Sequence, residues 1–359
     1  MKNLMLLLFL SVVVAVGFNS CSQCNRTKDA PVVTKDTSGN PKLDAVNEEI
    51  KKDSLNPFLY FKRAHIYDHN DDIKSATADM FKALSLDSAR SEFFLYAAEL
   101  FKKSAEPKRG IALMDKAITI DSLNTDLYVK AAELAFIDTT IKGNYLIALS
   151  YLNAAILKNP QNADIYFYKG NIFKELKDTA RAISSFQTAT ELNPKFYNAY
   201  VQLGLLLAQK KDKNAQKYLD NAIKVSDKPE DALYAKANIF KETALALQDA
   251  NKEAQARDKF NEAIETYKKV IEVNYKNVES YMGIGFSYYQ MDSVEQAYKY
   301  YSLAVKIEPT YAGAYFSKGL CAEDLGRKKE AMELYQTCLN IDPKFTRAQE
   351  HLKKLQPAL

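Results

Sequence analysis

The feature that most constrains this chain is a set of small residues that recurs in step along most of its length. One series comprises Ala64, Ala98, Ala132, Gly170, Gly204, Ala237, Gly285 and Gly319. Two more comprise Ala76, Gly110, Ala148, Ala182, Ala215, Ala263, Ala297 and Ala331, and Ala83, Ala117, Ala155, Ala189, Ala222, Val270, Ala304 and Cys338. These two step by 34, 38, 34, 33, 48, 34 and 34 residues, and the first series follows the same steps one unit later. Three series that keep one period indicate eight copies of a single structural unit.

The stretch from Asp164 to Pro194 illustrates one unit. Its apolar residues follow the helical period on both sides of a short polar turn, which predicts two packed amphipathic helices. Asn193-Pro194 ends the pair, because proline lacks an amide donor and disfavours helix in the residue before it. The stretch resembles a tetratricopeptide repeat, whose pattern falls here on Tyr166, Gly170, Phe173, Ala182, Phe186, Ala189 and Pro194.

This resemblance implies an all-α fold, a right-handed superhelical α-solenoid of eight helix-turn-helix repeats. Only 11 glycines and 10 prolines in 359 residues agree with long helices. We expect an N-terminal capping helix within residues 43–56 and a C-terminal capping helix and tail at 346–359, because terminal repeats lack a neighbour. The expected units are residues 57–90, 91–124, 125–162, 163–196, 197–229, 230–277, 278–311 and 312–345.

Two units are longer than the rest. The third carries four extra residues around Asp138-Thr139-Thr140, which predicts a longer turn. The sixth carries fourteen extra residues between Ala237 and Ala263. Fourteen is twice seven, so two added turns in each helix would preserve the apolar phase on both sides of a turn at Asp249-Ala250-Asn251. This hairpin is either a surface for a partner or a tolerated extension.

The first 20 residues read as an export signal. Lys2 precedes an apolar run from Leu4 to Phe18, which is too short to span a bilayer. Phe18-Asn19-Ser20-Cys21 resembles a bacterial lipoprotein signal, which implies lipidation of Cys21; ordinary cleavage and an uncleaved anchor are the alternatives. Residues 21–42 are rich in turn formers and predict a flexible tether. We therefore expect a protein of the bacterial envelope, anchored by lipid to the outer membrane and facing the periplasm.

The first helices of such repeats line a concave groove, and we expect partner proteins or peptides to bind there. The alternative is that the repeat pattern itself favours an aromatic residue and an asparagine at these positions, with no ligand implied. The predicted groove residues are Phe61, Leu95, Val129, Phe167, Asn171, Val201, Tyr234, Asn238, Met282, Phe286 and Phe316. Some family members grip a C-terminal carboxylate with Lys and Asn, but the matching pairs here, such as Leu95 with Glu99, do not form that clamp.

Other candidate sites are weaker. His65, Asp68 and His69 share one helix face and form a weak metal site, with surface polarity as the simpler explanation. Cys321 and Cys338 lie in the two helices of the last repeat, as a disulfide or as small core residues. We find no catalytic motif and expect no cofactor. Gly283-Ile284-Gly285 lies within a helix and indicates packing.

Composition narrows the partners further. The formal charge of +4 is spread along the chain, without a basic stripe interleaved with aromatic residues, so nucleic-acid binding is not expected. The sequence predicts a non-enzymatic, lipid-anchored interaction scaffold that serves outer-membrane assembly or secretion. The alternative is an exported lipoprotein that binds a small ligand or glycan.

Overall fold

The computed structural model describes residues 39–138 and 143–356. Within them the chain forms 18 α-helices and no strand. The bounds are α1 Pro41–Lys52, α2 Pro57–His69, α3 Ile73–Leu86, α4 Ser91–Lys103, α5 Pro107–Ile120, α6 Thr125–Ile137, α7 Asn144–Lys158, α8 Ala163–Glu175, α9 Thr179–Leu192, α10 Tyr197–Gln209, α11 Ala215–Val225, α12 Glu230–Asp249, α13 Glu253–Val273, α14 Val278–Gln290, α15 Val294–Ile307, α16 Ala312–Asp324, α17 Lys328–Ile341 and α18 Thr346–Leu355.

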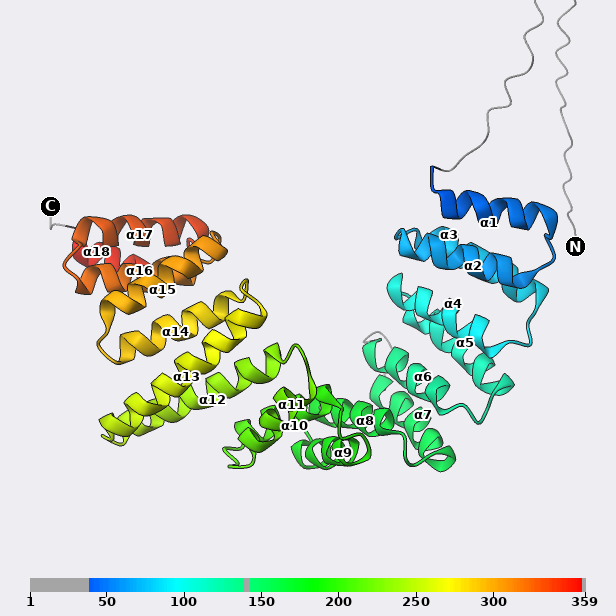
Figure 1. The fold of residues 1–359 in the computed structure, drawn as a ribbon, viewed down its shortest axis with the longest axis horizontal. Coiled ribbons are helices and arrows are strands. Elements are labelled where there is room, and N and C mark those ends of the chain that lie inside the picture. The colour runs from blue at the N-terminus through cyan, green and yellow to red at the C-terminus, as the bar shows by residue number, and fades with distance from the viewer. Residues whose placement is uncertain (1–38, 139–142, 357–359) are drawn as a thin grey trace, which may run out of the picture.

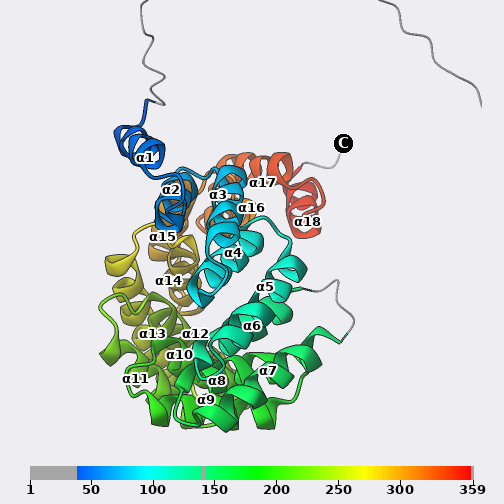
Figure 2. The ribbon, with the colours of Figure 1, turned by 90° about the vertical axis from the view of Figure 1, so that its right-hand side faces the viewer.

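The helices pair in sequence and stack into an open arc (Figure 1). First helices such as α6 and α8 lie on the inner side of the arc, and their partners α7 and α9 lie on the outer side (Figures 1 and 2). The helices α1 and α18 lie at its two ends. The predicted α-solenoid is therefore confirmed.

The small residues mark the closest approach of the two helices in a unit. A Cβ added at Gly170 would lie 2.6 Å from the ring of Phe186, and one added at Gly319 would lie 2.6 Å from the ring of Tyr335. Ala182 and Ala189 are fully buried, as are most other members of the three series. A larger side chain at these positions would force the helices apart, which explains why the small residues recur in step.

The turn within each unit uses a residue in the left-handed conformation. These residues are Asp71, Ala105, Gly143, Lys177, Lys211, Asn251, Asp292 and Gly326, with φ between 56° and 76°. The turns between units use a side-chain oxygen instead. Asn193 and Asp87 each accept a hydrogen bond from the amide two residues further on. Because Asp and Asn both provide this oxygen, Asp87-Ser88 can replace the Asn-Pro ending seen in other units.

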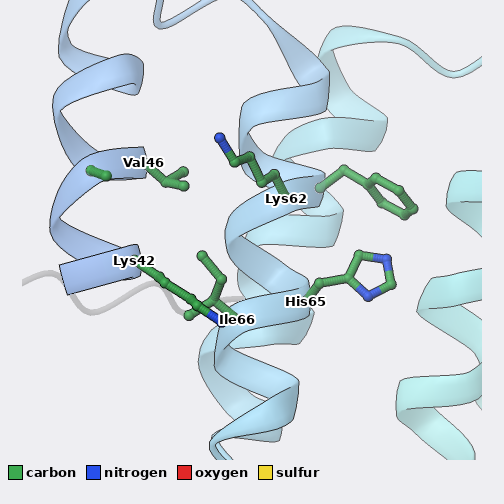
Figure 3. A pocket seen from close by; sticks show the side chains of 7 residues that line it. Lys42, Val46, Lys62, His65 and Ile66 are labelled. Carbon is green, nitrogen blue, oxygen red and sulfur yellow. The ribbon is translucent and has the colours of Figure 1, made fainter. Parts of the chain in front are cut away.

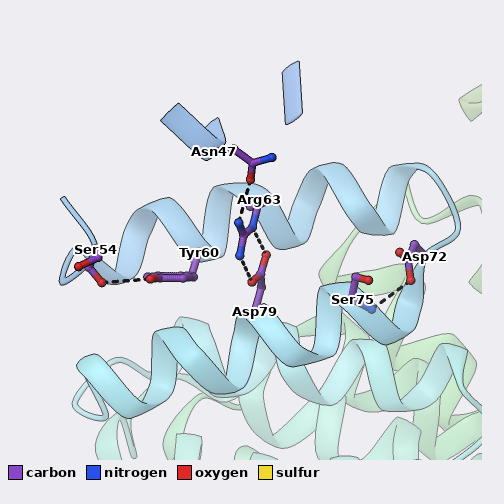
Figure 4. A network of polar contacts seen from close by, with 7 residues as sticks. All are labelled: Asn47, Ser54, Tyr60, Arg63, Asp72, Ser75 and Asp79. Carbon is purple, nitrogen blue, oxygen red and sulfur yellow. Dashed lines mark hydrogen bonds and ion pairs between the residues drawn. The ribbon is translucent and has the colours of Figure 1, made fainter. Parts of the chain in front are cut away.

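The N-terminal capping helix α1 begins earlier than the sequence predicted. The tether was expected to extend through Lys42, but the helix starts at Pro41 because the side chain of Asn40 caps it and proline is favoured in a first turn. Arg63 of α2 joins α1 to the first unit: its guanidinium donates to Asp79 of α3 at 2.7 Å and to Asn47 of α1 at 2.8 Å (Figure 4).

The extended sixth unit is a long helical hairpin. Its helices have 20 and 21 residues, against 13 and 14 in the unit that follows, so the fourteen extra residues are shared equally. The side chain of Gln248, near the end of α12, donates to the backbone oxygen of Gln290 at the end of α14. The extension is thus joined to the seventh unit on one side.

At the other end of the arc, α18 covers the last repeat. Ala348 is buried there, while Arg347, Glu350, Lys353 and Lys354 are exposed as the sequence predicted. Residues 39–138 and 143–356 contain no helix that is long and apolar enough to cross a membrane.

Candidate functional site

The predicted groove residues have different exposures. Phe61, Leu95, Phe167, Asn171, Tyr234, Asn238, Met282 and Phe286 are half-buried. Val129, Val201 and Phe316 are only 5%, 5% and 3% exposed, so the prediction that they line an open groove is wrong. The ring of Phe316 lies 5.0 Å from that of Phe345 and under the guanidinium of Arg347, because the C-terminal cap covers it. Val129 and Val201 are short side chains enclosed within the core clusters of their units.

The concave face of the first two units is filled by its own side chains. The ring of His65 stacks on Tyr96 with centroids 3.9 Å apart, and Phe61 packs against both. The carboxylate of Asp68 accepts hydrogen bonds from Lys103 at 2.6 Å and from Tyr96 at 2.9 Å. Burial alone would raise the pKa of Asp68, but these hydrogen bonds outweigh it and lower the pKa.

This packing argues against the weak metal site. The carboxylate of Asp68 is already neutralised by Lys103, which a cation would have to displace. The part of the chain that the structure describes contains no group of three metal-ligating side chains in reach of one ion.

An ion-pair network continues along the concave face of units two to four. Lys130 lies 3.3 Å from Glu99 and 3.2 Å from Glu133, and Lys102 lies 2.5 Å from Glu133. Burial would raise the pKa of Glu133, whereas the hydrogen bond from Lys102 and the charge of Lys130 lower it below its usual value. The acidic groove positions here are therefore satisfied within the protein.

A shallow hollow of about 580 Å³ lies at the N-terminal edge, between α1 and α2. Figure 3 shows Lys42 and Val46 of α1 facing Ile66 and Lys62 of α2. Lys62 is paired with Glu49 at 2.9 Å. The hollow is the gap left where a half-repeat, and not a full repeat, covers the first unit.

A second hollow of about 330 Å³ lies between the first helices of units six, seven and eight. It collects four predicted groove residues, Tyr234 and Asn238 of α12 and Met282 and Phe286 of α14. The remaining lining residues, which the sequence reasoning did not assign to the groove, are Lys241, Glu242, Leu245, Tyr267, Glu279, Gly283, Tyr301, Tyr311 and Ser317. We name this hollow the tyrosine pocket, after Tyr234, Tyr267, Tyr301 and Tyr311.

The tyrosine pocket exists because one repeat position becomes small in the last three units. Two residues before the first small series, the eight units carry Lys62, Tyr96, Lys130, Tyr168, Gln202, Ala235, Gly283 and Ser317. In units two to five this side chain contacts a polar group of the preceding unit, as Tyr96 contacts Asp68 and Gln202 contacts Lys174. Ala235, Gly283 and Ser317 are too short to do so, and the space stays open. This series was visible in the sequence and could have located the pocket.

The polar groups of the tyrosine pocket are unequally satisfied. The hydroxyl of Tyr267 donates to Asn238 at 2.7 Å, and Lys241 lies 3.4 Å from Glu242. Glu279, in the first turn of α14, forms no hydrogen bond or ion pair with the described part of the chain. Burial, followed by the neighbouring charge of Glu279, raises the pKa of Tyr311. The pocket thus combines aromatic rings with one carboxylate that lacks a cation.

The two cysteines of the last repeat are buried free thiols. Burial raises the pKa of Cys321 to about 12 and that of Cys338 to about 11, which keeps both protonated at neutral pH. Their role here is that of small core residues. Cys21, the predicted lipidation site, lies outside the described residues.

Comparison with known proteins agrees with the geometry. Family models described as "Tetratricopeptide repeat" match residues 278–311, 312–345 and 142–195, and one described as "TPR repeat" matches 256–292. The C-terminal part of a TPR repeat-containing protein from Cytophaga hutchinsonii has a TM-score of 0.51 at 20% identity, covering 67% of this chain and 93% of that one; this likeness shows the fold.

Curated relatives resemble only part of the chain. The tomato (Solanum lycopersicum) protein "Probable UDP-N-acetylglucosamine--peptide N-acetylglucosaminyltransferase SPINDLY" is 35% identical over 98 residues, which are 27% of this chain and 10% of that protein. Human tetratricopeptide repeat protein 6 is 28% identical over 177 residues, 48% of this chain and 31% of that protein. The chain thus spans about a tenth of the first of these relatives, and the shared part is the repeats. From the period, the helix pairs and the matched family models together, we conclude that this chain is a tetratricopeptide-repeat protein.

Proposed function

We propose that this protein is a non-catalytic scaffold that binds partner proteins or peptides on its concave face. Tetratricopeptide-repeat proteins generally bind other proteins or peptides. The observation that carries the proposal is the tyrosine pocket, an open hollow on the face where the other repeats fill the equivalent space with their own side chains. Its volume suits one large side chain of a partner, which could act as an anchor for an extended segment.

The second part of the proposal concerns location. Export and lipidation at Cys21 would place the scaffold in the bacterial envelope, at the outer membrane and facing the periplasm. The support comes from the apolar run that ends at Phe18 and from the cysteine that follows it. A partner pathway in outer-membrane assembly or secretion fits such a location.

The anchor is tested by metabolic labelling with a palmitate analogue. The wild-type protein should incorporate the label, and Cys21→Ala should not. Cys24→Ala is the matched control and should label normally. Undiminished labelling of Cys21→Ala excludes this cysteine as the anchor.

The groove is tested by crosslinking in intact envelopes followed by identification of captured proteins. Tyr234→Asp, in the tyrosine pocket, and Phe167→Asp, in the middle of the concave face, should each reduce capture. Tyr275→Asp is the matched control, because Tyr275 is 63% exposed and lies outside the pocket. An unchanged partner set in both groove variants would place the interface on the outer face or on the α12–α13 hairpin.

A second candidate function is binding of a small exported ligand or glycan. The small volume and the tyrosine rings of the pocket favour it, because sugars stack on aromatic faces. A thermal-shift screen of the full chain against envelope glycans and small metabolites tests it. A ligand that raises the melting temperature of the wild type and the Tyr275→Asp control, but not of Tyr234→Asp, would support this function.

A further inference from the structure

The tyrosine pocket has walls of different character. Tyr234 of α12 and Tyr311, at the N-cap of α16, have hydroxyls without a hydrogen-bond partner in the described chain. The rings of Tyr234 and Tyr267 lie 5.8 Å apart. Tyr267 and Tyr301 are 1% and 4% exposed, so they form the floor, while Tyr234 and Tyr311 stand at the half-buried rim. An incoming side chain therefore meets the rings of Tyr234 and Tyr311 first.

One wall of the pocket already holds a cation. The ammonium of Lys241 lies 5.9 Å from the ring centroid of Phe286 and 3.2 Å from the side-chain oxygen of Asn238. Aromatic faces attract cations through their ring quadrupole, and a nearby oxygen or carboxylate adds to this attraction. The contacts of Lys241 show that this geometry is compatible with an ammonium group.

The opposite wall has the same components without a cation. Tyr311 senses the charges of Glu279 and Tyr234, which places the three groups close together. Elsewhere on the concave face, carboxylates are paired: Asp68 with Lys103, and Glu133 with Lys102 and Lys130. Glu279 is in the first turn of α14, where a negative charge also stabilises the helix dipole. A role confined to the helix dipole would affect stability and not binding, so the two are separable.

We propose that the tyrosine pocket binds a lysine or arginine side chain from an extended segment of a partner protein. The cation lies against the rings of Tyr234 and Tyr311 and is neutralised by Glu279, while the alkyl stem contacts Met282. This inference rests on the proposed scaffold function and specifies the chemistry of its partner. An acidic or purely apolar anchor is disfavoured, because it would leave Glu279 unpaired beside a newly desolvated site.

The test uses the full chain in detergent and four pools of degenerate heptapeptides with blocked ends. Their central residue is fixed as lysine, arginine, norleucine or glutamate, and the bound fraction of each pool is measured. Norleucine has the apolar stem of lysine without its charge. We expect the lysine and arginine pools to bind about tenfold better than the norleucine pool, and this ratio should fall as salt is raised.

Variants assign the preference to the pocket. Glu279→Gln and Tyr234→Leu should each reduce the lysine-to-norleucine ratio toward one. Glu272→Gln is the matched control, because Glu272 is an exposed carboxylate of the neighbouring helix α13 outside the pocket, and it should keep the ratio. Circular dichroism and melting of each variant show whether it is folded, and Tyr234→Phe, which keeps the ring face, should retain the preference.

The outcomes distinguish this inference from the proposed function. Equal binding of all four pools, or loss of the preference in Glu272→Gln as well, overturns the cationic anchor. If crosslinking capture then still depends on Tyr234, the scaffold function stands with a different anchor. If capture is also independent of Tyr234, the proposed function fails with it.

Discussion

The concave faces of units one to four and of units six to eight use the same repeat positions in opposite ways. In the first region, Tyr96, Lys130 and Tyr168 each contact an acidic group of the preceding unit and close the surface. In the second, Ala235, Gly283 and Ser317 leave the tyrosine pocket open. The comparison shows that the repeat assigns a residue to the groove, but the size of one neighbouring side chain decides whether that groove can accept a partner.

Gly283→Val should have the largest effect on stability. A Cβ at this position would lie 2.5 Å from the ring of Tyr267, which has almost no room to move because it is 1% exposed. We expect a loss of about 3 kcal/mol in the free energy of unfolding. Urea unfolding followed by circular dichroism measures it. A loss below about 0.5 kcal/mol would mean that the sixth and seventh units are not packed as closely as described.

Tyr96→Ala should cost more than Tyr311→Ala, although both remove a half-buried tyrosine from the concave face. Tyr96 loses its stacking on His65 and its hydrogen bond to Asp68, so we expect about 2 kcal/mol. Tyr311 has no hydrogen-bond partner, and we expect about 1 kcal/mol or less. Equal losses in urea unfolding would contradict the distinction between a closed and an open region.

Ser317→Tyr should convert the open region toward the closed one. It places in unit eight the residue type that Tyr96 and Tyr168 provide in units two and four. The new ring should occupy the tyrosine pocket and reduce capture of the partner about tenfold, which corresponds to about 1.4 kcal/mol of binding free energy. Quantitative crosslinking measures the loss. Ser302→Tyr, on the second helix α15, is the control, and equal loss in both variants would show that the pocket is not the reason.

Acid should destabilise the closed region through Glu133. Its pKa is lowered from 4.5 by Lys102 and Lys130, so the folded state favours the charged form. The resulting stability is present above about pH 4.5, the unfolded value, and is lost as the pH falls through the lower folded value. We expect about 1 kcal/mol of this loss to be absent in Glu133→Gln. Urea midpoints at pH 7, 5, 4 and 3.5 test it, and parallel pH profiles would contradict it.

The smallest effects concern the turns within the units. Ala105 of unit two adopts φ 57°, where unit eight has Gly326 at φ 75°. Ala105→Gly should raise the free energy of unfolding by about 0.5 kcal/mol, because the relief of left-handed strain exceeds the entropic cost of glycine. Gly326→Ala should lower it by about 1 kcal/mol. Changes of the same sign in the two variants would show that these turns do not share one conformation.

Much of this protein follows from its sequence alone. The three series of small residues determine the unit lengths, the helix pairs and the buried positions, because two helices can approach closely only where side chains are small. The fourteen extra residues of unit six predict a longer hairpin, since they add whole turns to each helix. Asn193 and Asp87 likewise predict where units end, because a side-chain oxygen there caps the backbone turn.

The tertiary structure decided which concave residues remain accessible. Val129, Val201 and Phe316 occupy groove positions in the repeat, yet neighbouring helices and the cap α18 cover them. Tyr311 and Glu279 join the tyrosine pocket from two different units, at the start of α16 and of α14. A periodic sequence specifies contacts within a unit, whereas the exposure of a groove residue depends on the sizes of side chains one unit away, and the stacking of the repeats brings those side chains together.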